Sequence, residues 1–127
     1  MYKIILIGLG GFVGSILRYS LSGAVQQLSK SISFPYGTLF VNLFGCLCVG
    51  FLSYLSEEHG FLTGMQRQLV FIGLLGGFTT FSTFMNETMH LTMDGKLFFT
   101  LINVVAHIVL GFLAVWLGRA TAHFIWR

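Results

Sequence analysis

The chain has 127 residues, of which 55% are hydrophobic and only 9% are charged. A soluble domain carries about 25% charged residues, so the composition predicts a single integral membrane domain, residues 1–127, whose outer surface contacts the lipid bilayer. The formal charge of +3 comes from scattered residues that form no basic stripe, which argues against nucleic acid as a partner.

The apolar runs predict four membrane-spanning helices, because crossing a bilayer takes about 20 largely apolar residues. The predicted spans cover residues 4–28, 35–56, 65–93 and 97–124. An even number of spans puts both chain termini on one side of the membrane. In the first span, small residues recur at a spacing that predicts close packing against a neighbouring helix; they are Gly8, Gly10, Gly11 and Gly14.

The basic residues show almost no bias between the two sides of the membrane. Four of them fall on the side of the termini and three on the other, namely Lys3, Arg67, Arg119 and Arg127 against Arg18, Lys30 and Lys96. A bias in Lys and Arg is what selects one orientation during insertion. The near-even count predicts insertion in both orientations, which would permit an antiparallel homodimer, although a single topology stays open.

The third predicted span contains a segment that is poorly suited to a continuous helix. The segment is residues 73–87, GLLGGFTTFSTFMNE, in which a glycine pair at 76–77 is followed by four hydroxyl side chains. Glycine weakens a helix, and Ser and Thr offer the backbone alternative hydrogen bonds. We predict a break here, which would free backbone carbonyls at membrane depth. Such backbone is tolerated only in a protein interior or beside a polar cavity, so an ion site and a transport function are favoured.

Several side chains near this break are candidates for an anion path. Asn42 lies in the middle of the second span, where its amide could bond a neighbouring helix or donate to a dehydrated anion. Phe81 and Phe84 share a helical face, and their rings could simply pack or could turn a positive edge towards an anion. Ser82 and Thr83 could continue a polar track, or each could bond the carbonyl one turn back.

Ionisable residues within the spans form a second group of candidates. Glu87 lies near the end of the third span, where it is either functional or an interfacial group. Arg18 could snorkel to the headgroups or supply positive potential to an aqueous vestibule. Asn103 and His107 are four residues apart and share a face of the fourth span. No second metal ligand accompanies His107, which argues against zinc, and no nucleophile triad or nucleotide loop has the context that an enzyme requires.

Three blocks of sequence resemble the Fluc fluoride channels, also called the CrcB family. They are GLGGFVGSILRY at residues 8–19, GTLFVNLFGCLCVG at 37–50 and GLLGGFTTFSTF at 73–84. The order of the blocks, the four spans and the chain length agree with the family as well. The resemblance implies an all-α membrane protein with four transmembrane helices and a break in the third. It further implies an antiparallel, dual-topology homodimer with two fluoride pores in the bacterial cytoplasmic membrane.

The resemblance also implies roles for individual residues. It assigns Asn42, Phe81 and Phe84 to the pore wall, Ser82 and Thr83 to a polar track beside it, Glu87 to a position further along, Arg18 to a pore entrance, and the backbone carbonyls of Gly76 and Thr79 to a structural sodium ion at the dimer centre. The fourth span departs from the family pattern, because Asn103 stands where Tyr is frequent and His107 where Ser is frequent. We therefore expect His107 at most to flank the pore.

The alternative function is a small multidrug-resistance-type exporter coupled to protons, which also has four spans and can insert in both orientations. Such a carrier needs a carboxylate deep in the membrane, whereas the first span has none and Glu87 lies late in the third. A membrane subunit without transport activity is a third possibility, but it would not need the hydroxyl-rich break.

Overall fold

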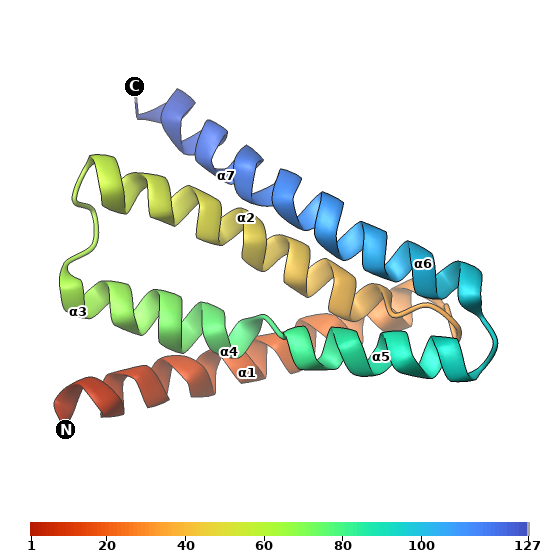
Figure 1. Ribbon diagram of the computed structural model, residues 1–127. Coiled ribbons are helices and arrows are strands. Elements are labelled where there is room, and N and C mark those ends of the chain that lie inside the picture. The colour runs from red at the N-terminus through yellow and green to blue at the C-terminus, as the bar shows by residue number, and fades with distance from the viewer. Residues whose placement is uncertain (127) are drawn as a thin grey trace.

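The computed structural model describes residues 1–126 as an all-helical protein (Figure 1). Four helical rods are long and apolar enough to cross a membrane, so the chain is a multi-pass membrane protein as predicted. The first two rods are α1, Tyr2–Ser29, and α2, Tyr36–Glu58. The third comprises α3 Gly64–Arg67, η1 Gln68–Leu75, α4 Gly76–Phe78 and α5 Phe81–Met93. The fourth comprises α6 Leu97–Val105, η2 Ala106–Leu110 and α7 Gly111–Ile125.

The connections between the rods follow from local hydrogen bonding. Gln26 near the end of α1 donates to the Ser31 and Phe34 carbonyls at 2.6 and 3.1 Å and accepts from the Gly37 amide at 3.0 Å. The turn before α6 contains Gly95 with φ of 72°, a conformation that costs glycine little. Figure 1 shows the two termini at the same end of the bundle, as the even number of spans predicts. Arg127, one of the charges counted above, lies outside the described residues.

Glycines allow the helices to approach one another closely. A Cβ placed at Gly10 would lie 2.8 Å from the Leu69 carbonyl oxygen, and one placed at Gly77 would lie 2.6 Å from that of Gly11. The predicted close packing of the first span is therefore confirmed, with η1 and α4 as its neighbours. Gly50 and Gly118 serve the contact between α2 and α7 in the same way, since an added Cβ would overlap backbone on the facing helix.

The third rod is broken, but not at its glycine pair. Gly76 and Gly77 are helical residues of α4, and the chain becomes extended only at Thr79 (φ −91°, ψ 156°) and Thr80 (φ −152°, ψ 116°). The break itself agrees with the prediction, whereas the part assigned to the glycines was wrong. Gly77 is needed because α1 leaves no room for a side chain there.

Candidate functional site

Asn42 on α2 holds the break in the third rod. Its side-chain oxygen accepts the Thr80 amide at 2.9 Å, and its Nδ2 group donates to the Thr80 carbonyl oxygen at 3.1 Å. A single amide side chain thus bonds both backbone polar groups of Thr80, one of the two residues between α4 and α5. Nδ2 carries two hydrogens, so one N–H of Asn42 remains for a further acceptor. Asn42 is therefore both a helix–helix contact and a possible donor.

Thr80 then begins α5. Its hydroxyl oxygen accepts the Thr83 amide at 3.2 Å, which is an N-cap interaction. The same hydroxyl donates to the Thr83 side chain at 3.0 Å and lies 3.3 Å from the Ser82 hydroxyl. Three of the four predicted hydroxyls therefore gather at one helix N-terminus, where the peptide dipoles favour negative charge. The fourth, that of Thr79, donates to the Leu75 carbonyl at 2.9 Å.

The break leaves backbone carbonyls without their usual amide partners, and those of Gly76 and Thr79 are among them. In a continuous helix the Thr80 amide would donate to Gly76 and the Thr83 amide to Thr79. Here Asn42 takes the first amide and the Thr80 hydroxyl takes the second. The carbonyl oxygens of Gly76 and Thr79 are thus available to a ligand, and oxygen is the atom type that hard cations prefer.

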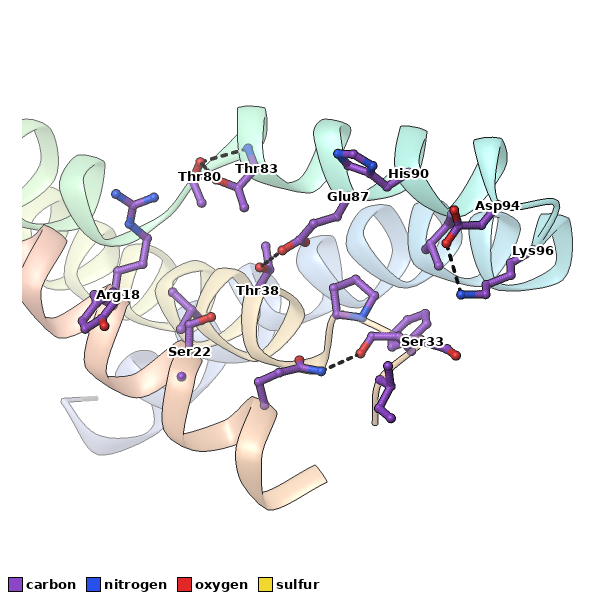
Figure 2. Close-up of a pocket in the computed structure, with 18 residues that line it drawn as sticks. Arg18, Ser22, Ser33, Thr38, Thr80, Thr83, Glu87, His90, Asp94 and Lys96 are labelled. Carbon is purple, nitrogen blue, oxygen red and sulfur yellow. Dashed lines mark hydrogen bonds and ion pairs between the residues drawn. The ribbon is translucent and has the colours of Figure 1, made fainter. Parts of the chain in front are cut away.

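A cavity of about 670 Å³ opens beside the break, between α1, α2 and α5. Figure 2 shows Arg18, Thr38, Thr80, Thr83 and Glu87 around it. The Thr38 hydroxyl donates to Glu87 Oε1 at 2.6 Å, while Glu87 Oε2 has no partner among residues 1–126. Arg18 forms no ion pair within the same residues. The cavity is thus polar, and it carries charges of both signs.

Lys96 and Asp94 line the far end of this cavity and pair with each other at 3.2 Å (Figure 2). The charge of Lys96 is therefore neutralised by Asp94. Arg18 is the basic side chain of the cavity near the break, and it has no carboxylate partner in the described chain. A positive side chain at this place would attract anions from solution.

Phe81 and Phe84 lie on another part of α5. Their rings are 5.7 Å apart between centroids in an edge-to-face arrangement. Phe84 is buried, with 5% of its surface exposed, and its other face stacks on the His107 ring at 4.1 Å. Phe81 is 74% exposed on the outside of the single chain. An exposed ring beside a polar break in a membrane helix is a surface that another helix could cover.

Asn103 and His107 hold the fourth rod against α5. Asn103 is fully buried and donates through Nδ2 to the Thr88 hydroxyl at 2.9 Å. The Thr88 hydroxyl in turn donates to the Phe84 carbonyl at 2.7 Å. His107 Nδ1 lies 2.9 Å from the Asn103 carbonyl oxygen, so the two residues interact as their spacing predicts.

A single chain does not bring all the predicted site residues together. Asn42, Thr83, Glu87 and Arg18 belong to the break and its cavity, whereas Phe81, Phe84 and His107 form a separate stack. Thr38 lines the cavity but was not singled out from the sequence. A signal was present, because Thr38 lies one turn before Asn42 on the same face. Thr80 was predicted only as one hydroxyl of the break, although a Thr directly before a helix is a common N-cap.

Comparison with known proteins decides the family. A family model described as "CrcB-like protein, Camphor Resistance (CrcB)" matches residues 5–119. The chain belongs to the CrcB family. The match covers most of the chain, including the break, α2 and the fourth rod through Arg119.

Individual CrcB relatives match over nearly their full length. The chain is 48% identical to a protein of Methanosarcina acetivorans named "Fluoride-specific ion channel FluC 1", with 96% of this chain and 92% of that protein covered. It is 43% identical to "Fluoride-specific ion channel FluC" of Methylobacillus flagellatus, with 93% and 92% covered. A "FluC 3" of Methanosarcina barkeri is 42% identical, with 96% and 91% covered. These CrcB relatives are named as channels and not as enzymes.

Proposed function

We propose that the chain is a fluoride-selective channel through which cytoplasmic fluoride leaves the cell passively. The observation that carries this proposal is the extended pair Thr79–Thr80. It puts a cluster of hydroxyls and several unpaired backbone carbonyls in the middle of a membrane span, next to the unused N–H of Asn42. Irregular backbone is tolerated at membrane depth only in a protein interior or beside a polar cavity, and here a polar cavity opens beside it. The names of the relatives identify fluoride as the ligand to test first.

Neutral donors suit a small and strongly hydrated anion. The remaining Asn42 N–H and the hydroxyls of Ser82 and Thr83 can replace water around fluoride without adding a fixed charge. Conduction needs binding that is strong enough to admit the ion and weak enough to release it. In this proposal Arg18 concentrates anions in the cavity, and Glu87 flanks the path beyond Thr83.

Phe81 and Phe84 supply the apolar part of the proposed pore wall. The edge of an aromatic ring carries positive partial charge, so a ring edge can face an anion without transferring a proton to it. The planes of the two rings are inclined by 64°, so the edge of one ring meets the face of the other. His107 flanks this wall through its stacking on Phe84.

The proposed assembly is an antiparallel homodimer with two pores. It would cover the exposed Phe81 ring and the neighbouring Met85 and Met89, which are 44% and 57% exposed in the single chain. It would also bring together the Gly76 and Thr79 carbonyls of two copies. Those carbonyls fit a sodium ion because they are neutral oxygen donors that have lost their amide partners. A cation held there would offset part of the cost of bringing anions into a low dielectric.

The proposed location is the bacterial cytoplasmic membrane. Hydrogen fluoride enters cells as a neutral molecule and ionises in a less acidic cytoplasm. The trapped anion then needs a path through the bilayer, and a passive channel supplies it without energy coupling. Fluoride resistance is the expected physiological result.

Fluoride efflux from sealed proteoliposomes, read with a fluoride electrode, tests the proposal. We expect efflux in the absence of a proton gradient, and no comparable efflux from protein-free vesicles. Transport of a cationic drug that depends on a proton gradient would instead support the small multidrug-resistance-type exporter. Reporter fusions at the C-terminus, read from each side of the membrane, test the antiparallel arrangement separately. A single orientation for every copy would overturn it.

A further inference from the structure

The His107 ring presents an unpaired nitrogen beside the proposed pore wall. Its Nδ1 lies 2.9 Å from the Asn103 carbonyl oxygen, and a carbonyl oxygen can only accept, so Nδ1 must carry a hydrogen. In the neutral ring the other nitrogen, Nε2, is then a bare lone pair. Nε2 is buried and has no hydrogen-bond partner among residues 1–126.

The ring is held firmly in this position. It stacks on Phe84 with 4.1 Å between centroids and 27° between planes. The Phe84 ring is buried. The Phe84 carbonyl accepts the Thr88 hydroxyl at 2.7 Å and the Thr88 hydroxyl accepts the buried Asn103 amide at 2.9 Å, which ties α5 to the fourth rod beside the ring. The Thr88 hydroxyl uses its only hydrogen on Phe84, which sets the orientation of the Asn103 amide. The Nε2 atom therefore cannot readily turn towards another partner.

No charged group of the described chain neutralises this imidazole. The titratable groups on the elements that pack around η2 are Glu87 and His90 on α5, Tyr36, Cys46, Cys48, Tyr54, Glu57 and Glu58 on α2, Lys96 before α6, and Arg119 and His123 on α7. None of them forms a hydrogen bond or an ion pair with His107 within residues 1–126. Glu87 is bonded to Thr38, and Arg119 is paired with Glu57 at 2.8 Å.

We propose that His107 Nε2 is a proton-linked anion site, so that fluoride and a proton bind there together. The inference rests on the proposed fluoride channel and adds a residue to its path. An unpaired lone pair repels an anion, whereas a protonated Nε2 donates a hydrogen bond and carries positive charge. Burial penalises either ion alone, and the imidazolium–fluoride pair relieves both penalties. The proton comes from water and returns to water when fluoride leaves.

Thermodynamic linkage fixes the direction of the effect. If protonation favours fluoride binding, then fluoride must favour protonation by the same factor. Acidification should therefore lower the fluoride concentration at which flux is half-saturated. Couplings between binding sites amount to about fivefold or more in affinity, so we expect at least about a fivefold decrease from pH 7.5 to pH 5.5.

The test compares half-saturating fluoride at these two pH values in proteoliposomes, after subtraction of efflux from protein-free vesicles. The wild-type chain should show the decrease, and His107→Gln, which keeps a polar side chain of similar size, should not. His59→Gln is the matched control, because His59 is an exposed residue at the C-terminus of α2 and its ring lies beside Tyr54, away from Phe84 and His107. It should keep the wild-type shift. Retention of the shift in His107→Gln would overturn the assignment. A third variant, His90→Gln, should also keep the shift, and loss of the shift in His90→Gln but not in His107→Gln would overturn the assignment as well.

A second measurement needs no variant. Fluoride added to the weakly buffered wild-type channel in micelles should cause proton uptake near pH 6, beyond that of empty micelles, and chloride should not. Fluoride flux with the same half-saturation at both pH values, and no proton uptake, would refute the proton linkage alone. Absence of fluoride flux at every pH would refute the proposed channel function and this inference with it.

Discussion

The substitution Asn42→Asp addresses the residue on which the break depends. The carboxylate would keep an acceptor for the Thr80 amide, now 2.9 Å away, but would lose the donor that reaches the Thr80 carbonyl at 3.1 Å. The Thr80 carbonyl is half-buried and is also the N-cap acceptor of α5, so losing this one hydrogen bond costs about 0.5–1.5 kcal/mol. The negative charge would also stand where the free N–H of Asn42 is proposed to meet fluoride.

The electrostatic part of this change should dominate. Two like charges about 4 Å apart repel by about 4 kcal/mol at an effective dielectric constant of about 20. Because each ~1.4 kcal/mol is a factor of ten, fluoride occupancy beside the introduced carboxylate should fall about a thousandfold in Asn42→Asp. Asn42→Ala removes both hydrogen bonds to Thr80 without adding charge, so it should impair flux less than Asn42→Asp.

Fluoride efflux from proteoliposomes measures both variants, and size-exclusion chromatography of the same preparations checks that they remain assembled. The expected order of flux is wild type, then Asn42→Ala, then Asn42→Asp. Undiminished flux in Asn42→Asp would remove Asn42 from the pore. Equal flux in the two variants would mean that the hydrogen bonds to Thr80, and not charge in the path, explain the loss.

Three further predictions concern the pore wall, the helix packing and the cation. Phe81→Ile and Phe84→Ile should each reduce fluoride flux while the assembly persists, because an aliphatic side chain has no positive edge; wild-type flux in both would refute the aromatic contribution. Gly77→Val should lower the thermal stability or yield of the protein, since its Cβ would lie 2.6 Å from the Gly11 carbonyl oxygen, whereas Gly8→Ala, with nothing within 4 Å, should match the wild type; equal yields would contradict the close packing. Replacing sodium by a large organic cation should lower the melting temperature of the assembly if the Gly76 and Thr79 carbonyls hold sodium, and an unchanged melting temperature would exclude a structural ion.

Prediction from the sequence succeeded for features that depend only on the composition of one segment. The four spans, their bounds to within two residues and the break in the third span follow from apolar length and from the Gly, Ser and Thr content of residues 73–87. The role of Gly76–Gly77 was misjudged because local helix propensity was weighed without the neighbouring helix. Against α1, Gly77 relieves a steric clash, and the cost of glycine in the helix is small beside it.

Contacts between spans could not be read from the sequence. Asn42 and Thr80 are 38 residues apart, and nothing local indicates that one amide satisfies both backbone groups of Thr80. Thr38 and Glu87 are 49 residues apart, and their bond appears only when α2 and α5 lie together. The stack of Phe84 on His107 likewise depends on how the fourth rod crosses α5.

Apolar length and residue type along the chain indicate that it lies in a bilayer as four helices, that the third is broken, and which residue types could meet an ion. Which donors are used up and which stay free follows from the packing of the helices. The physical reason is that a hydrogen-bonding group in a membrane must find a partner. Whether that partner is the protein or a ligand depends on helices that meet only in three dimensions.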